Sequence, residues 1–185
     1  SPQLDERQRC SGCWPTAAKL RERLVESVRV DSSPTSSSIR AGLAREMRVL
    51  NAIGGRIREA EGGTAAVVTV MQAFDSPADV LRERIIGLEL ETIVGRDPVA
   101  LRNRLRALIA ETPYSGLDPL DRPYLAEFRL MMALGQVGDA KRTIDAWDRD
   151  RAGEFASVDS IARNIARGEL ALVEGRLAEA LARFR

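Results

Sequence analysis

Histidine is absent from this chain of 185 residues, and cysteine occurs only at Cys10 and Cys13. The lack of histidine removes the commonest general base and the commonest metal ligand. Two cysteines are too few for a framework of disulfides. Aromatic residues make up 4% of the chain, which is few for a surface that stacks on nucleic-acid bases. We therefore expect no catalytic residue, no bound metal and no cofactor.

Net charge and hydropathy argue against two further kinds of partner. Lysine and arginine together number 28, and aspartate and glutamate 27, so a formal charge of +1 offers no general attraction to nucleic acid or to an anionic membrane. The longest mostly apolar stretch, residues 65–74, is far too short to span a bilayer. No basic-then-apolar leader is visible. We expect a cytoplasmic protein without nucleic-acid binding or membrane insertion; the soluble part of a membrane-anchored or exported protein is the alternative.

The short motif Cys10-Ser11-Gly12-Cys13-Trp14 has the spacing of a chemical site. A thioredoxin-type site needs a βαβ context, and the sequence that follows has no such pattern. A zinc site needs two further cysteine or histidine ligands, and a haem attachment needs histidine after the second cysteine. We interpret the two thiols as incidental, with a local disulfide or an intermolecular metal site as the alternative.

Composition divides the chain into three parts. Residues 1–38 are interpreted as an N-terminal extension, with one helix over 16–30 and a Ser-rich linker over 31–38 that ends as the cap of the next helix. Residues 39–76 are interpreted as a degenerate first repeat or as packing helices, and residues 77–185 as three helical hairpins.

Two glycine pairs interrupt the helical pattern of the second part. Gly54-Gly55 is interpreted as a turn between two helices, because glycine costs about 1 kcal/mol in a helix interior. Gly62-Gly63 is expected to end the helix that follows this turn. The next stretch, residues 64–74, is apolar and β-branched, and its composition leaves both a strand and a buried helix open.

The third part carries regular signals of helix starts and stops. Ser76, Asp97, Asp121 and Ser157 precede helical patterns and are expected to cap them. The expected helices cover residues 77–94, 98–111, 121–135, 138–151, 157–174 and 176–185. No alternating strand pattern interrupts them, so the sequence predicts an all-α fold.

A period of 40 residues runs through the chain. Glycine recurs at this spacing, with an alanine five residues after each glycine and a leucine five residues before it. The three columns are Gly55, Gly95, Gly135, Gly175; Ala60, Ala100, Ala140, Ala180; and Leu50, Leu90, Leu130, Leu170. We expect each glycine in a turn, each alanine where two helices approach, and each leucine on a buried stripe. Helical sequences with a period of about 20 to 50 residues are typical of stacked hairpins.

Residues 133–140 and 168–184 resemble the tetratricopeptide repeat family. The second segment carries a small residue in its first helix, Gly168, then a turn glycine, an alanine and an aromatic knob, Phe184, in matching places. The chain departs from the family in its longer spacing, since the family repeats about every 34 residues. It also departs at Arg48, Leu88 and Phe128, where the family favours a small residue. The spacing is also similar to the helical repeats that follow regulatory domains in large bacterial transcriptional activators and signalling kinases.

The resemblance implies a right-handed α-solenoid that serves as a non-catalytic scaffold for a protein or peptide, bound on a wall made by the first helix of each hairpin. Carried over position by position, the wall residues are Arg82, Glu89, Thr92, Arg122, Leu125, Arg129, Met132, Ile165, Glu169 and Leu172. One alternative is that this wall packs on the chain's own N-terminal helices. Two other functions stay open: a regulatory or sensor segment of a larger bacterial signalling or transcriptional regulator, and an all-α enzyme that uses carboxylates.

Two other clusters have structural interpretations. Arg102 and Arg106 share one helix face, which would suit a phosphate, but a solvated face is favoured because no aromatic residue is interleaved. Met131 and Met132 are interpreted as core residues, with a groove for a partner helix as the alternative.

The last helix carries an apolar stripe of Leu177, Ala180, Leu181 and Phe184. One side of this stripe is expected to pack on the preceding helix, and the sequence supplies no cap for the other side. We therefore expect Leu177, Leu181 and Phe184 to form an exposed end patch that further repeats, a second chain or a partner covers. From this patch we expect that the chain can associate with itself, as a homo-oligomer, through its C-terminal end.

Overall fold

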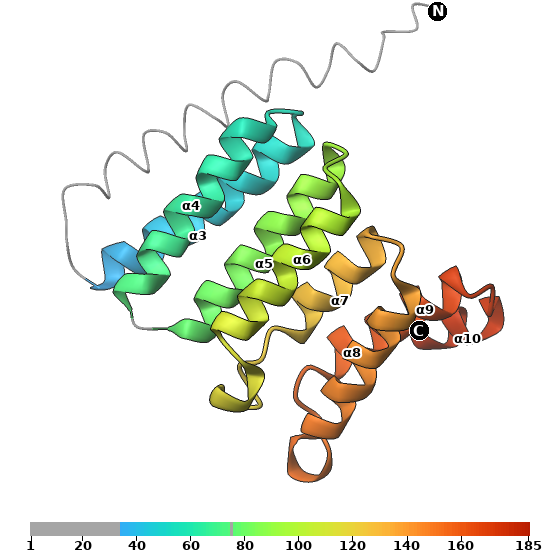
Figure 1. Cartoon of the computed structure of the whole chain (residues 1–185). Coiled ribbons are helices and arrows are strands. Elements are labelled where there is room, and N and C mark those ends of the chain that lie inside the picture. Colours follow the sequence, from blue (N-terminus) through green and yellow to red (C-terminus); the bar gives the residue numbers. More distant parts are fainter. Residues whose placement is uncertain (1–33, 75) are drawn as a thin grey trace, which may run out of the picture. The chain divides into compact units, whose positions relative to one another are not determined.

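The computed structural model describes residues 34–74 and 76–185 (Figure 1). In this part of the chain eight α-helices, labelled α3 to α10, and two short 3-10 helices form, and no strand does. The described chain is therefore all-α, as its helical periodicity predicts. Its contacts divide it into two units, residues 1–74 and 75–185, and each is described by itself. Cys10, Cys13 and the helix expected over 16–30 lie outside the described residues.

The first unit contains two helices, α3 (Pro34–Ile53) and α4 (Ile57–Ala73), which pack side by side (Figure 1). The turn between them contains Gly54 and Gly55, as the sequence predicts. Buried side chains of Ala41, Ala60 and Val67 form part of their contact.

Two sequence interpretations of this unit need correction, and one open alternative is resolved. Helix α3 begins at Pro34, inside the segment interpreted as a linker. Helix α4 continues through Gly62-Gly63, and a Cβ on Gly63 would lie 3.2 Å from the Cβ of Arg48, so glycine permits a close approach of the two helices. Residues 64–73 are helical, because Val67 and Met71 lie one turn apart and are buried together, and this burial outweighs β-propensity.

The second unit contains three pairs of helices. They are α5 (Pro77–Ile93) with α6 (Pro98–Glu111), α7 (Tyr124–Ala133) with α8 (Val137–Asp150), and α9 (Ser160–Val173) with α10 (Leu177–Arg183). A 3-10 helix, η1 (Tyr114–Gly116), lies in the connection before α7, and η2 (Gly153–Phe155) lies in the connection before α9.

Helix α7 lies at the centre of the second unit. It packs against its own partner α8 and also against α5 and α9, the first helices of the other two pairs (Figure 1). Phe128 and Leu130 of α7 are completely buried, together with Ile85 of α5 and Trp147 of α8. Residues from α5, α7 and α8 therefore form a common core around α7, and Trp147 of this core also lines the candidate site.

The four glycines of the 40-residue period share one backbone conformation. Gly55, Gly95, Gly135 and Gly175 have φ between +68° and +78°, a region in which an L side chain is strained. At Gly135 the N–H donates to the Met132 carbonyl at 3.0 Å, and the next N–H donates to the Met131 carbonyl at 2.8 Å. This pair of hydrogen bonds is the Schellman motif that ends a helix.

The expected caps are correct at one position and wrong at three. Asp97 caps α6, because its carboxylate accepts from the N–H groups of Val99 at 3.0 Å and Ala100 at 3.3 Å. Ser76 stands at the start of α5, but its hydroxyl donates to the Asp79 carboxylate at 2.7 Å instead of accepting from the backbone. Asp121 and Ser157 do not cap, since α7 begins after Pro123 and α9 begins after Asp159.

The alanine and leucine columns are buried unequally. Ala60, Ala140 and Ala180 are buried at helix contacts, whereas Ala100 is exposed, and Leu105 is buried in α6 instead. The prediction of a close contact at Ala100 is therefore wrong, because α6 presents a different side chain to its neighbours. In the leucine column Leu130 and Leu170 are buried and the two earlier leucines are half-buried.

Candidate functional site

A pocket of about 270 Å³ opens where α5, α7 and the start of α9 meet. Its walls come from α5, α7 and α9, which are the first helices of the three pairs, from the loop before α7, and from Trp147 of α8. The lining residues are Arg82, Ile86, Glu89, Leu120, Arg122, Pro123, Leu125, Ala126, Arg129, Trp147, Asp159 and Ala162. We call this cavity the α7 pocket.

Half of the wall predicted from the sequence lines this pocket. The five residues are Arg82, Glu89, Arg122, Leu125 and Arg129. The other five lie elsewhere on α5, α7 and α9. Thr92 donates its hydroxyl to the Glu89 carbonyl at 2.6 Å, and Met132 packs against the core.

The remaining three wall residues belong to α9. Ile165 and Leu172 are exposed, and Glu169 is half-buried. None of the three lines the α7 pocket.

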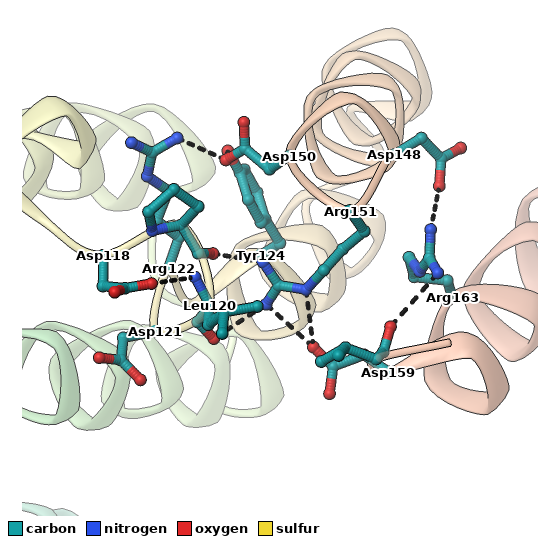
Figure 2. A network of polar contacts seen from close by, with 12 residues as sticks. Asp118, Leu120, Asp121, Arg122, Tyr124, Asp148, Asp150, Arg151, Asp159 and Arg163 are labelled. Atoms are coloured by element: carbon teal, nitrogen blue, oxygen red, sulfur yellow. Dashed lines mark hydrogen bonds and ion pairs between the residues drawn. The ribbon is translucent and has the colours of Figure 1, made fainter. Parts of the chain in front are cut away.

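Arg151 holds one rim of the pocket in place (Figure 2). Its side chain is 1% exposed, and its guanidinium donates to the Leu120 carbonyl at 2.8 Å and to the Asp159 carboxylate at 3.0 Å, with a further bond to the Pro119 carbonyl. Leu120 and Asp159 both line the pocket. One buried cation therefore ties the loop before α7 to the start of α9.

Arg163 makes the corresponding contacts at the connection between α8 and α9 (Figure 2). Its guanidinium donates to the Val158 carbonyl at 3.2 Å and to the Asp148 carboxylate at 3.3 Å, and also bonds the Ala156 carbonyl. Asp148 in addition pairs with Arg167. This connection is therefore held by charge-assisted hydrogen bonds, which are stronger than neutral ones.

Tyr124, Asp150 and Arg122 form a second polar cluster (Figure 2). The Tyr124 hydroxyl donates to Asp150 at 2.5 Å, and Arg122 forms an ion pair with the same carboxylate. Burial raises the pKa of Tyr124 to about 12, and the hydrogen bond to Asp150 acts in the same direction. Burial alone would raise the pKa of Asp150, but the hydrogen bonds from Tyr124 and Arg122 outweigh it and hold that pKa below its ordinary value. Asp150 is therefore ionised at neutral pH.

Aromatic rings form the floor behind this cluster. Trp147 stacks on Tyr124 with ring centroids 6.2 Å apart, and Tyr114 meets Tyr124 edge to face at 5.3 Å. Trp147 is 3% exposed, and its indole N–H has no hydrogen-bond partner among the described residues. The Nε–H of Arg122 is likewise buried without a partner in the described structure.

The charges around the pocket are mostly neutralised within the protein. Arg82 pairs with Asp79, Arg122 with Asp150, and Asp159 with Arg151. Arg129 is exposed, and its side chain makes no ion pair or hydrogen bond with any other described residue. The pocket lining therefore combines the exposed guanidinium of Arg129 with the carboxylate of Glu89.

A second cavity of about 450 Å³ lies between α6, α7 and α8. Arg102 and Arg106 line it, together with Tyr114, Glu127 and Thr143. The Tyr114 hydroxyl donates to Glu127 at 2.7 Å. Burial raises the pKa of Glu127 above its ordinary value, and hydrogen bonds from Tyr114 and Thr143 partly oppose the rise.

Glu127 is the strongest observation in favour of an enzyme, because a carboxyl of raised pKa in a cavity is suited to acid–base chemistry. The other carboxylate that lines this cavity, Asp139, pairs with Arg142. Glu127 accepts from the Tyr114 hydroxyl, so each of the two carboxyl groups has a partner inside the protein.

Sequence reasoning missed three residues of the site: Trp147, Arg151 and Asp159. A tryptophan on the apolar face of a helix was visible, but nothing local connects it with α7. Arg151 and Asp159 lie eight residues apart, and the burial of the arginine depends on a loop about 30 residues earlier. The left-handed backbone of Asp159, with φ of +55°, also has no clear signal in the sequence.

The structure places the predicted end patch on α10. Leu177 is 61% exposed, Leu181 60% and Phe184 48%, while Ala180 is buried against α9. The Phe184 ring reaches Gly168 of α9. The helix thus has a packed side and an apolar side that no described residue covers.

Among the described residues no helix is both long and apolar enough to cross a membrane. The same residues contain no group of three or more cysteine, aspartate or glutamate side chains placed to hold a metal ion. No protein-family model, curated protein or solved structure matches this chain.

Proposed function

We propose that residues 77–185 form a tetratricopeptide-like module of three stacked hairpins, a right-handed α-solenoid with a period of 40 residues, that binds a segment of another protein. The carrying observation is the α7 pocket, which is lined by five residues of the wall that the repeat pattern assigns to binding. Helices α5, α7 and α9 occupy equivalent places in the three pairs and contact one another in series.

Two further observations support the repeat interpretation. Gly95, Gly135 and Gly175 end the first helix of each pair with the same left-handed backbone. The ring of Phe184 packs on Gly168, which is the pairing of a small residue with an aromatic knob that the family resemblance implies.

The chemistry of the pocket suits a polypeptide ligand. Apolar surface from Ile86, Leu125 and Trp147 would contribute affinity, and the arginine side chains at its edge would contribute specificity. A volume of about 270 Å³ accommodates one or two side chains, so the rest of a bound segment would lie along α5 and α9.

Selection of peptides from a displayed random library on the full chain tests the proposal. We expect enriched peptides whose binding falls at least about tenfold in Leu125→Glu, since loss of one buried apolar contact and an added charge exceed 1.4 kcal/mol. Arg106→Glu, in the second cavity, is the matched control and should bind as the wild-type chain does. Peptides that bind Leu125→Glu and wild type equally would contradict the proposal.

A further inference from the structure

The second cavity contains a half-buried carboxylate that has no cationic partner among the described residues. Glu127 accepts from the Tyr114 hydroxyl at 2.7 Å, but it forms no ion pair within the described part of the chain. Burial raises the pKa of Glu127, because the ionised form loses part of its hydration. Charged groups inside proteins are usually paired with an opposite charge. The carboxylate therefore lacks a cation that a ligand in this cavity could supply.

The other charged residues of the cavity lie on α6 and α8. On α8, Asp139 pairs with Arg142, so these two charges neutralise each other. On α6, Arg102 is half-buried and Arg106 is exposed, and neither makes an ion pair or hydrogen bond with another described residue. The full set of charges thus leaves one carboxylate on α7 and two arginines on α6 without partners of opposite charge in the described structure.

Apolar and aromatic side chains supply much of the remaining lining. Leu105 and Ile109 of α6 and Met131 of α7 are available to contact methylene groups. The Tyr114 ring also lines the cavity next to Glu127, and aromatic rings attract cations. The lining therefore suits a ligand with an apolar middle and a cationic end beside Glu127.

We infer that the second cavity binds a small zwitterion in which a primary ammonium and a carboxylate are joined by a short apolar chain. The ammonium pairs with Glu127, and the carboxylate pairs with Arg102. A simple amine would leave Arg102 without a partner, and a simple carboxylate would leave Glu127 without one. Since these two residues lie on different helices, separated charges fit better than the adjacent charges of an α-amino acid.

This site is separate from the one proposed to bind a polypeptide. The second cavity and the α7 pocket share no lining residue. The exposed Arg106 stays hydrated and is not assigned a contact with the zwitterion. A chain that binds library peptides but no zwitterion, or a zwitterion but no peptide, would therefore separate the two proposals.

Calorimetric titration of the full chain with matched probes tests the inference. The probes are 6-aminohexanoate, hexylamine, which lacks the carboxylate, and hexanoate, which lacks the ammonium. We expect saturable binding of 6-aminohexanoate and affinities at least about tenfold lower for the two singly charged probes, because each loses one charge-assisted contact. Leucine, in which both charges lie on one carbon, should also bind more weakly.

Variants assign each end of the ligand to its partner. Glu127→Gln keeps an acceptor for Tyr114 and should weaken 6-aminohexanoate about tenfold while leaving hexanoate unchanged. Arg102→Gln should weaken 6-aminohexanoate by a similar factor and leave hexylamine unchanged. A merely structural role of either residue would affect all three probes alike. Arg149→Gln, which is exposed on α8 and lines neither cavity, is the matched control and should change no affinity.

Three results would overturn the inference. One is equal affinity for the three matched probes, which would mean that apolar contact alone drives binding. Another is an affinity for 6-aminohexanoate that is insensitive to Glu127→Gln. The third is the absence of saturable binding for every ω-amino acid from 4-aminobutanoate to 8-aminooctanoate, which would mean that the hydrogen bond from Tyr114 is all that Glu127 requires.

Discussion

The ring of Phe184 lies directly over the backbone of Gly168, at the contact between α10 and α9. A Cβ on Gly168 would lie 2.5 Å from Cε1 and 2.8 Å from Cζ of that ring. Any larger residue at position 168 of α9 must therefore displace the Phe184 ring. The contact explains why a helix interior, which disfavours glycine, contains one at this position.

The effect of Gly168→Ala on the free energy of unfolding should depend on the residue at position 184, and should change sign when Phe184 is replaced by alanine. In the wild-type chain the crowded methyl costs about 1–3 kcal/mol, which exceeds or cancels a gain in helix propensity of about 1 kcal/mol. In a Phe184→Ala background the crowding disappears, and Gly168→Ala should raise the free energy of unfolding. Denaturant unfolding of the four chains of this cycle measures the coupling.

Gly62→Ala is the control for helix propensity alone. Gly62 lies inside α4, and no described atom outside its own helical turn lies within 4 Å of the place that a Cβ would take, so alanine should stabilise by about 0.5–1 kcal/mol. Additive effects of the changes at 168 and 184 would contradict the packing described for Phe184.

The alanine column predicts a contrast between two helices. Ala140 is completely buried in α8, so Ala140→Leu should lower the free energy of unfolding by about 1–3 kcal/mol through overpacking. Ala100 is exposed at the start of α6, and Ala100→Leu should change the free energy of unfolding by less than about 0.5 kcal/mol. Thermal unfolding of both variants is sufficient, and equal losses would show that Ala100 is buried as the period alone suggests.

Arg151 should be one of the most sensitive residues of the second unit. Arg151→Met removes the donor for the Pro119 and Leu120 carbonyls and leaves Asp159 without its partner, so we expect a loss of about 3–5 kcal/mol. Arg149→Met, an exposed neighbour on α8, is the control and should cost less than about 0.5 kcal/mol. A chain that tolerates Arg151→Met as well as Arg149→Met would rule out the bridging role of Arg151.

Asp150 and Glu127 should give opposite pH dependences. The folded state lowers the pKa of Asp150, so its contribution is present above the ordinary pKa of about 3.9 and is lost as the pH falls through the folded value. The folded state raises the pKa of Glu127, so stability declines as the pH rises from about 4.3 through the raised value.

Urea unfolding of two variants across about pH 3 to 7, the range in which both carboxyl groups change the free energy of unfolding, distinguishes the two contributions. Asp150→Asn should lose about 1.5–3 kcal/mol at neutral pH and approach the wild-type value in acid. Glu127→Gln should match the wild type in acid and gain relative to it as the pH rises. Parallel pH profiles for the wild type and both variants would refute the environments described for these carboxyls.

The exposed side of α10 should promote self-association. Leu177 and Leu181 are both more than half exposed and lie one turn apart. We expect sedimentation to show a mass that rises with concentration, and Leu177→Glu with Leu181→Glu to restore the monomer. Both changes spare Phe184, so the contact with Gly168 is kept, and a wild-type chain that stays monomeric at high concentration would exclude this interface.

The sequence by itself determined the helical class and most helix boundaries of the second unit. Local chemistry is sufficient for these features: Asp97-Pro98 starts α6, and glycine at 95, 135 and 175 supplies the left-handed residue that a helix end requires. The resemblance to the tetratricopeptide family, carried over position by position, assigned to the wall the five residues of α5, α7 and the loop before α7 that line the α7 pocket.

Tertiary structure alone decided the features that depend on distant partners. Gly63 lies inside a helix where Arg48 packs against it, and residues 64–73 are helical because Val67 and Met71, one turn apart, are both buried. Ala100 is exposed despite its place in the period. The α7 pocket itself arises because Trp147 and the loop held by Arg151 reach α7 from other parts of the chain. Hydrogen bonding and burial between residues far apart in sequence set these contacts, and no local pattern of residue types encodes them.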